Sequence, residues 1–143
     1  MFVSPELVEG TLRHGWEMLR NLSDPFGRAA FIMFLVTEVH PFDDDNGRLA
    51  RAMMNAELVA GGQRRILIPI VYREDYLLAL LALSRSDNTE PMLRMLDRAQ
   101  DFCARIDFTN LDHALGVLNT YNAFEAHPGV LQLPPEPVTS SRA

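Results

Sequence analysis

The stretch "HPFDDDNGRLAR", from His40 to Arg51, decides how this chain is interpreted. It joins a histidine before a proline, three consecutive aspartates, an Asn-Gly pair and two arginines. Neighbouring carboxylates repel one another, and Asn-Gly favours turns over regular structure. Local stability does not account for such a composition, whereas a site for a metal ion and a polyanion does.

The residues on either side of this stretch predict helices. Asp24-Pro25 is a helix start signal, and residues 26–39 are apolar almost all round, as in a buried central helix that must end before Pro41. Residues 46–60 carry apolar side chains at helical spacing and stop at Gly61-Gly62. The other helices are expected at residues 5–20, 73–85, 91–106 and 111–124. The segment "RRILIPIV" reads as an extended connector. The sequence thus predicts an all-α fold of about six helices, with the motif loop between two central ones.

The composition is that of an ordinary globular protein: 143 residues, 48% hydrophobic and 22% charged. A net charge of -6 argues against nucleic acid as a partner, because non-specific binding needs a dense basic face. Neither a signal peptide nor a membrane-spanning run is visible, so no membrane association is expected. The single cysteine, Cys103, allows no internal disulfide and lies in apolar sequence. We therefore expect a buried thiol and a cytoplasmic protein, with delivery into a host cell as an alternative.

Anion binding follows from the geometry of the segment. The first amides of a helix that begins near Asn46 carry unpaired N–H donors and partial positive charge. Arg48 and Arg51 are one helical turn apart, so both can face one ligand. Two guanidinium groups above a helix N-terminus suit a di- or triphosphate.

Metal binding and proton transfer are the other functions that these residue types suit. A polyphosphate usually arrives with Mg²⁺, which needs one or two carboxylates, and one of Asp43, Asp44 and Asp45 could serve. His40 ends the rigid central helix, and its ordinary pKa suits a general base at neutral pH. A calcium-binding loop is excluded, because the glycine comes one position early and Met54 stands where the pattern needs a glutamate. The residues predict transfer from a nucleoside triphosphate to a hydroxyl; a solvated acidic turn is the plain alternative.

The same stretch resembles the signature of the Fic (Fido) family, His-Pro-Phe-x-(Asp/Glu)-Gly-Asn-Gly-Arg-x-x-Arg, and satisfies eleven of its twelve positions. The surroundings are similar too, with an "AA…F" helix before the motif, an "N…L…G" helix after it, and "REDYLLAL" further on. The resemblance covers roughly residues 2–108. It implies an all-α fold and a protein adenylyltransferase, which moves AMP from the co-substrate ATP to a Ser, Thr or Tyr hydroxyl of a target protein.

The resemblance also implies roles for the residues of the loop. His40 would be the base that takes the proton of the target hydroxyl. Asp44 would bind Mg²⁺. Pro41 and Phe42 would be structural, with Phe42 as a buried anchor for the loop.

Four further positions would hold the nucleotide phosphates. Asn46 and Gly47 would line the anion cradle. Arg48 and Arg51 would hold the outer phosphates. A Fic-like domain would then span residues 1–108, followed by a C-terminal helix packing on it at 109–126 and an extended or frayed Pro-rich tail at 127–143.

Asp45 departs from the family pattern, because the motif has glycine there. Asp tolerates left-handed backbone better than most residues, but a second carboxylate beside the cradle repels phosphate. Three outcomes therefore stay open: activity on a shifted substrate, weak activity, or a binding relic.

The upstream β-hairpin flap of related domains is expected to be missing. The rival hypothesis is accordingly a degenerate Fic-like module without catalysis, silenced by Asp45 and by the lack of a flap. Hydrolytic removal of AMP is a further alternative, although no glutamate stands out to activate water. The stretch "SPELVEG" approaches the family's inhibitory helix but is one residue too long, so we expect an ordinary helix there. An inhibitory protein or segment would have to be separate.

Overall fold

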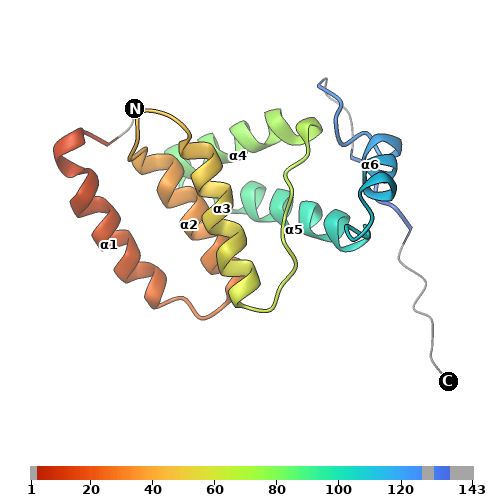
Figure 1. Cartoon of the computed structure of the whole chain (residues 1–143). Coiled ribbons are helices and arrows are strands. Elements are labelled where there is room, and N and C mark those ends of the chain that lie inside the picture. The colour runs from red at the N-terminus through yellow and green to blue at the C-terminus, as the bar shows by residue number, and fades with distance from the viewer. Residues whose placement is uncertain (1–2, 127–130, 136–143) are drawn as a thin grey trace. The chain divides into compact units, whose positions relative to one another are not determined.

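The computed structural model describes residues 3–126 and 131–135, and contacts divide the chain into two compact units, Met1–Arg65 and Ile66–Ala143. The predicted all-α class is confirmed: the described residues form six α-helices and no strand (Figure 1). The domain bounds at residues 108 and 126 stay a prediction. The helices of the first unit are η1 (Pro5–Leu7), α1 (Val8–Arg20), α2 (Pro25–Val39) and α3 (Asn46–Ala60). Those of the second unit are η2 (Ile70–Tyr72), α4 (Arg73–Ser86), α5 (Glu90–Ala104) and α6 (Leu111–Thr120).

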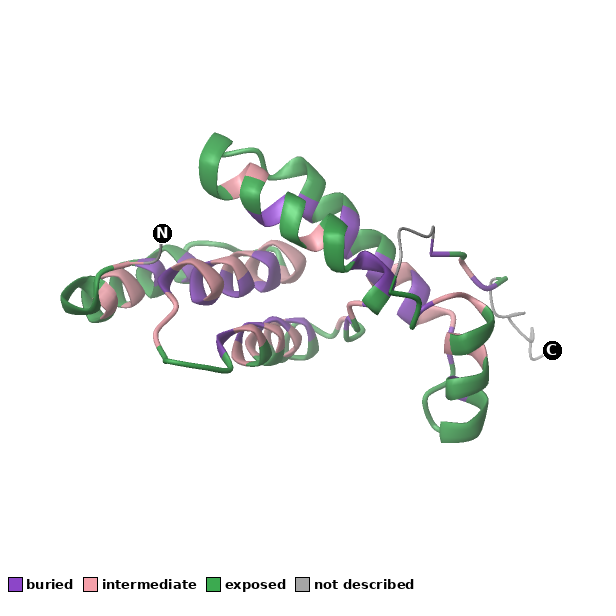
Figure 2. Ribbon diagram, turned by 90° about the horizontal axis from the view of Figure 1, so that it is seen from above, coloured by how far each residue is buried: buried purple, intermediate pink, exposed green. Residues whose placement is uncertain are grey.

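Helix α2 is the centre of the first unit, and both α1 and α3 pack against it. It begins where the Asp24 side chain accepts a hydrogen bond from the Gly27 N–H (2.6 Å), with Pro25 at the first position. Its buried positions, which are purple in Figure 2, recur from Ala29 to its end, as the apolar sequence predicted. They are Ala29, Ala30, Ile32, Met33, Leu35, Val36 and Val39. A helix buried in this way is a rigid base for the residue that ends it, His40.

An ion pair fixes α3 against α2 at the end far from the motif loop. Arg28 Nε donates to Glu57 Oε2 at 2.7 Å, and its Nη1 donates to the carbonyls of Leu19 (2.7 Å) and Leu22 (3.1 Å). Both charged side chains are largely buried. One arginine thus ties α2 to α3 and to the end of α1, and its removal would leave the Glu57 carboxylate without its cationic partner, whereas the Leu19 carbonyl would keep the Leu22 N–H.

The apolar residues of α1 are more exposed to solvent than the sequence suggested. Leu7, Leu12, Trp16 and Leu19 could have formed one buried side, but only Leu19 is fully buried, and Leu7 and Trp16 are exposed. Ser4 precedes η1 without a side-chain cap. Glu9 pairs with Arg13 on the helix's own surface at 2.8 Å, as in an ordinary amphipathic helix.

The second unit is built on the pairing of α4 with α5. The connector before η2 forms no regular structure, as expected, and is held by single contacts: the Leu67 N–H donates to Cys103 Sγ (3.2 Å), and the Ile70 N–H donates to the Ala123 carbonyl (2.8 Å). Cys103 is buried, as predicted. Its burial raises the pKa of the thiol, and the hydrogen bond from the Leu67 backbone partly opposes that shift.

The C-terminal segment that the structure describes, residues 131–135, is not frayed. Leu131 is fully buried, and its carbonyl accepts from Arg98 Nη2 at 3.0 Å. The Pro134 carbonyl accepts from Arg105 Nη1 at 2.9 Å. The rest of the predicted tail lies outside the described residues. Across the described parts of the chain, no helix has the length and apolar character that a membrane span requires.

Candidate active site

The motif loop reverses the chain between two left-handed residues. Helix α2 ends at His40 with φ 54°, and α3 begins directly after Asp45 with φ 63°. Residues other than glycine adopt this region at a cost of roughly 1 kcal/mol, so both positions need support from their surroundings. The predicted start of α3 at Asn46 is confirmed, and the loop therefore sits at the helix N-terminus.

Asn46 supplies much of that support. It is 2% exposed and, apart from the hydroxyl of Tyr72 and the thiol of Cys103, is the one buried polar side chain among the described residues. Its Oδ1 accepts from the Phe42 N–H (3.0 Å), and its Nδ2 donates to the Phe42 carbonyl (2.6 Å). The side chain thus holds both backbone groups of one loop residue. The asparagine amide closes the loop, a role that the sequence did not reveal because it depends on how the loop folds back.

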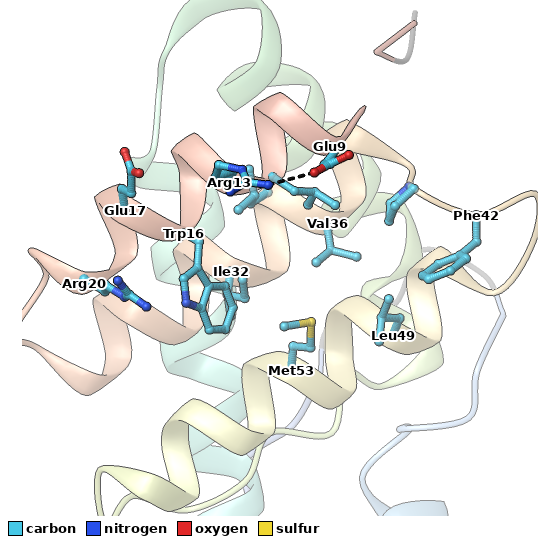
Figure 3. Close-up of a pocket in the computed structure, with 13 residues that line it drawn as sticks. Glu9, Arg13, Trp16, Glu17, Arg20, Ile32, Val36, Phe42, Leu49 and Met53 are labelled. Atoms are coloured by element: carbon cyan, nitrogen blue, oxygen red, sulfur yellow. Dashed lines mark hydrogen bonds and ion pairs between the residues drawn. The ribbon is translucent and has the colours of Figure 1, made fainter. Parts of the chain in front are cut away.

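Phe42 does not anchor the loop as a buried side chain, and that prediction is wrong. It is 61% exposed, while its backbone is fixed by Asn46. Its ring lies at one end of a groove of about 590 Å³ in the first unit (Figure 3). The rim of the groove carries charged residues of α1, namely Glu9, Arg13, Glu17 and Arg20. Its apolar lining is Leu12, Trp16, Ile32, Leu35, Val36, Pro41, Phe42, Leu49 and Met53.

His40 is held by a hydrogen bond to the helix that it ends. Its Nδ1 lies 3.2 Å from the Thr37 carbonyl oxygen, which can only accept, so Nδ1 carries the proton in this contact. In the neutral ring the lone pair is then on Nε2. This is the tautomer that a general base needs, and the histidine lies half-buried beside the loop.

The three aspartates all lie exposed on the loop. The Asp45 N–H donates to Asp44 Oδ1 at 2.7 Å. No group of three or more His, Cys, Asp or Glu side chains among the described residues is arranged to hold a metal ion. The binding of Mg²⁺ by one of these carboxylates therefore stays a prediction.

The backbone amides at the start of α3 are the groups that could receive an anion. Leu49 is the first residue of α3 whose N–H is bonded within the helix, to the Asp45 carbonyl at 3.0 Å. The N–H groups of Asn46, Gly47 and Arg48 precede it, and such groups at a helix start are the usual donors to a phosphate.

The two arginines behave differently. A Cβ added at Gly47 would lie 3.3 Å from Arg51 Nη1, so the Arg51 guanidinium lies against the first turn of α3, beside the cradle. A side chain at position 47 would require this guanidinium to shift by a few tenths of an ångström. Arg48 instead pairs with the Asp45 carboxylate at 3.2 Å, with the two side chains 80% and 59% exposed. The three-residue spacing of Asp45 and Arg48 could have revealed this pair.

Comparisons with known proteins match the part of the chain that contains the motif loop. The sequence profile of the Fic/DOC family matches residues 1–58. The protein adenylyltransferase fic-1 of Caenorhabditis elegans is 28% identical over 138 residues, which is 94% of this chain and 26% of that protein. The fic-1 protein of Caenorhabditis briggsae is 33% identical over 89 residues, 59% of this chain and 18% of its own length.

A solved structure of a Fic-1 fragment from C. elegans matches with a TM-score of 0.62 and 26% identity, over 82% of this chain and 34% of that one. The chain spans about a quarter or less of the length of the two curated relatives. Their full activities are therefore those of longer proteins. Residues 1–58 of this chain, which contain the whole motif loop, thus match the Fic/DOC family.

Proposed function

We propose that this chain transfers a nucleoside monophosphate, AMP from ATP, to a hydroxyl side chain of a target protein. The observation that carries the proposal is the placing of three amides and the Arg51 guanidinium around one helix start, with His40 at the other end of the same loop. The relatives named protein adenylyltransferases support the reaction class.

In this proposal the target hydroxyl attacks the α-phosphorus of ATP. A bond forms between the hydroxyl oxygen and phosphorus, and the bond from phosphorus to the bridging oxygen breaks, so that pyrophosphate leaves. The hydroxyl proton passes to Nε2 of His40, whose ring is oriented by the Thr37 carbonyl. The hydroxyl belongs to Ser, Thr or Tyr of the partner protein.

The phosphates would lie at the start of α3. The amides of Asn46, Gly47 and Arg48 would donate to them, and Arg51 would neutralise their charge. Asp44 would hold Mg²⁺, which when bound supplies charge neutralisation on the phosphate oxygens. The Asn46 side chain would act indirectly, because it fixes the loop backbone on which these groups depend.

The exposed Asp45–Arg48 pair should weaken nucleotide binding rather than abolish it. Two unit charges about 4 Å apart interact by roughly 1 kcal/mol in water and roughly 4 kcal/mol near a protein surface. Both side chains are mostly exposed, so the smaller figure applies more nearly, and exposed pairs seldom exceed about 1 kcal/mol. A loss of this size corresponds to roughly fivefold in affinity. The degenerate module remains the second candidate, and the same pair is the observation that favours it.

Transfer is tested with ATP labelled on its α-phosphate, incubated with this chain, Mg²⁺ and a lysate of candidate targets. We expect covalent label on protein from the native chain or from Asp45→Gly. His40→Ala should bind Mg-ATP as the parent does but transfer nothing, because it lacks only the base. Binding without transfer in both the native chain and Asp45→Gly would support the degenerate module and contradict the enzyme.

A further inference from the structure

A second groove, of about 670 Å³, lies wholly within the second unit, between α4 and α5. Its size falls in the range of roughly 300–1,000 Å³ that small-molecule sites occupy. It contains no residue of the motif loop. Leu78 and Ala79 of α4, Met95 of α5 and Leu131 give it an apolar lining.

The hydroxyl of Tyr72 is the unusual feature of this groove. Tyr72 is 6% exposed and immediately precedes α4, so its backbone is fixed by the helix start. Its hydroxyl is buried and makes no hydrogen bond of standard geometry among the described residues, and the Arg98 side chain beside it can only donate, so the O–H proton has no acceptor. Leaving such a group unsatisfied is unfavourable by about 5- to 150-fold in an equilibrium constant. Buried hydroxyls are normally paired, so this one indicates a partner that enters the groove.

Burial also determines the state of that hydroxyl. It raises the pKa of Tyr72, while the Arg98 guanidinium lies near enough to oppose the shift. The hydroxyl therefore keeps its proton at neutral pH and can donate it. A ligand atom that meets both the Tyr72 O–H and the Arg98 guanidinium must be an acceptor, and a carboxylate suits the pair best.

The other charges of the groove complete the pattern. Arg94 and Glu90 pair with each other, and Arg98 is oriented by its hydrogen bond to the Leu131 carbonyl at 3.0 Å. Asp75 lies one helical turn after Tyr72 and also lines the groove. Its carboxylate forms no ion pair or hydrogen bond within residues 3–126 and 131–135. A cationic ligand group would match this carboxylate.

We propose that this groove binds a small apolar zwitterion, such as an apolar amino acid or short apolar peptide with free termini. Its carboxylate accepts from the Tyr72 hydroxyl and from Arg98. Its ammonium group pairs with Asp75. Its apolar side chains cover Leu78 and Met95.

The probe is leucyl-leucine, titrated into the full chain by calorimetry. We expect a dissociation constant of about 1 mM or tighter. N-acetyl-leucyl-leucine, which lacks the ammonium group, and leucyl-leucinamide, which lacks the carboxylate, should each bind at least about tenfold more weakly, as for a lost charged hydrogen bond. No binding of leucyl-leucine at about 1 mM, or equal binding of all three compounds, would overturn the proposal.

Two variants keep the test specific. Tyr72→Phe removes one hydroxyl and keeps the ring, so leucyl-leucine should bind at least about fivefold more weakly while the Tm is unchanged or higher. Asp75→Asn should weaken the binding of leucyl-leucine but leave the binding of N-acetyl-leucyl-leucine unchanged. Tyr121→Phe, outside the groove, is the control and should bind as the native chain does. A lower Tm of Tyr72→Phe would mean that the hydroxyl is already satisfied by an internal water, which contradicts the proposal.

Discussion

Replacing Asp45 by glycine restores the residue of the family motif and tests how a carboxylate acts beside an anion cradle. The native carboxylate holds Arg48 at 3.2 Å. It also stands next to the amides that would receive phosphate. Asp45→Gly removes both effects at once, and glycine accepts the φ of 63° without strain.

The magnitude follows from the exposure of the pair. Freeing Arg48 from an exposed ion pair contributes about 0.2–1 kcal/mol. Removing the repulsion of phosphate contributes about 1 kcal/mol more at a water-like dielectric. Together they predict that Asp45→Gly binds Mg-ATP about 8- to 30-fold more tightly. The gain should shrink at high salt, because exposed charges are screened.

Calorimetry of Mg-ATP binding at low and high ionic strength measures this gain. Asp45→Asn separates charge from backbone freedom, since asparagine tolerates the left-handed region without a charge. Asp43→Asn is the matched control: it removes one exposed carboxylate of the same loop but leaves the Asp45–Arg48 pair intact. An Asp45→Gly chain that binds no more tightly than the native one, or an equal gain from Asp43→Asn, would refute the reasoning.

Three further predictions concern the scaffold. Arg28→Ala should lower the free energy of unfolding by about 2–3 kcal/mol in urea denaturation, because the part-buried Glu57 carboxylate loses its cationic partner and two carbonyls lose a donor, whereas removing the exposed Arg13 should lower it by less than about 0.5 kcal/mol. Asn46→Ala should lower the free energy of unfolding by about 1–3 kcal/mol and weaken Mg-ATP binding, because the loop loses both hydrogen bonds between the Asn46 side chain and the Phe42 backbone. Unchanged Mg-ATP binding would show that the loop closes without the Asn46 side chain. Since the folded pKa of Cys103 is raised, stability should be complete below the unfolded thiol pKa of about 8.5 and fall as the pH rises above it. Cys103→Ala should show a smaller fall in the same unfolding assay at alkaline pH.

Local signals in the sequence placed the helices well. Asp24-Pro25 marks the start of α2, and Gly61 marks the end of α3. These signals act within one turn, so they survive whatever packs around them. Gly61 also has a packing reason, because a Cβ there would lie 2.3 Å from Pro25.

Side-chain surroundings were harder to predict, because they depend on elements distant in sequence. The exposure of Phe42 and Trp16 follows from the groove that α1 and α3 leave above α2, and helical periodicity carries no information on such a gap. The loop-closing role of Asn46 needs the return of the chain to Phe42. Residues 131–135 are held by two arginines, Arg98 on α5 and Arg105 directly after that helix.

The central claim is that residues 40–51 hold a nucleoside triphosphate at the start of α3. The most direct test is calorimetric titration of Mg-ATP into the native chain, Asp45→Gly, Arg51→Ala and Arg20→Ala. The native chain and Arg20→Ala, whose arginine lies on α1 away from the cradle, should bind alike, Asp45→Gly should bind more tightly, and Arg51→Ala should lose binding. Absence of binding in both the native chain and Asp45→Gly, or undiminished binding in Arg51→Ala, would contradict the claim.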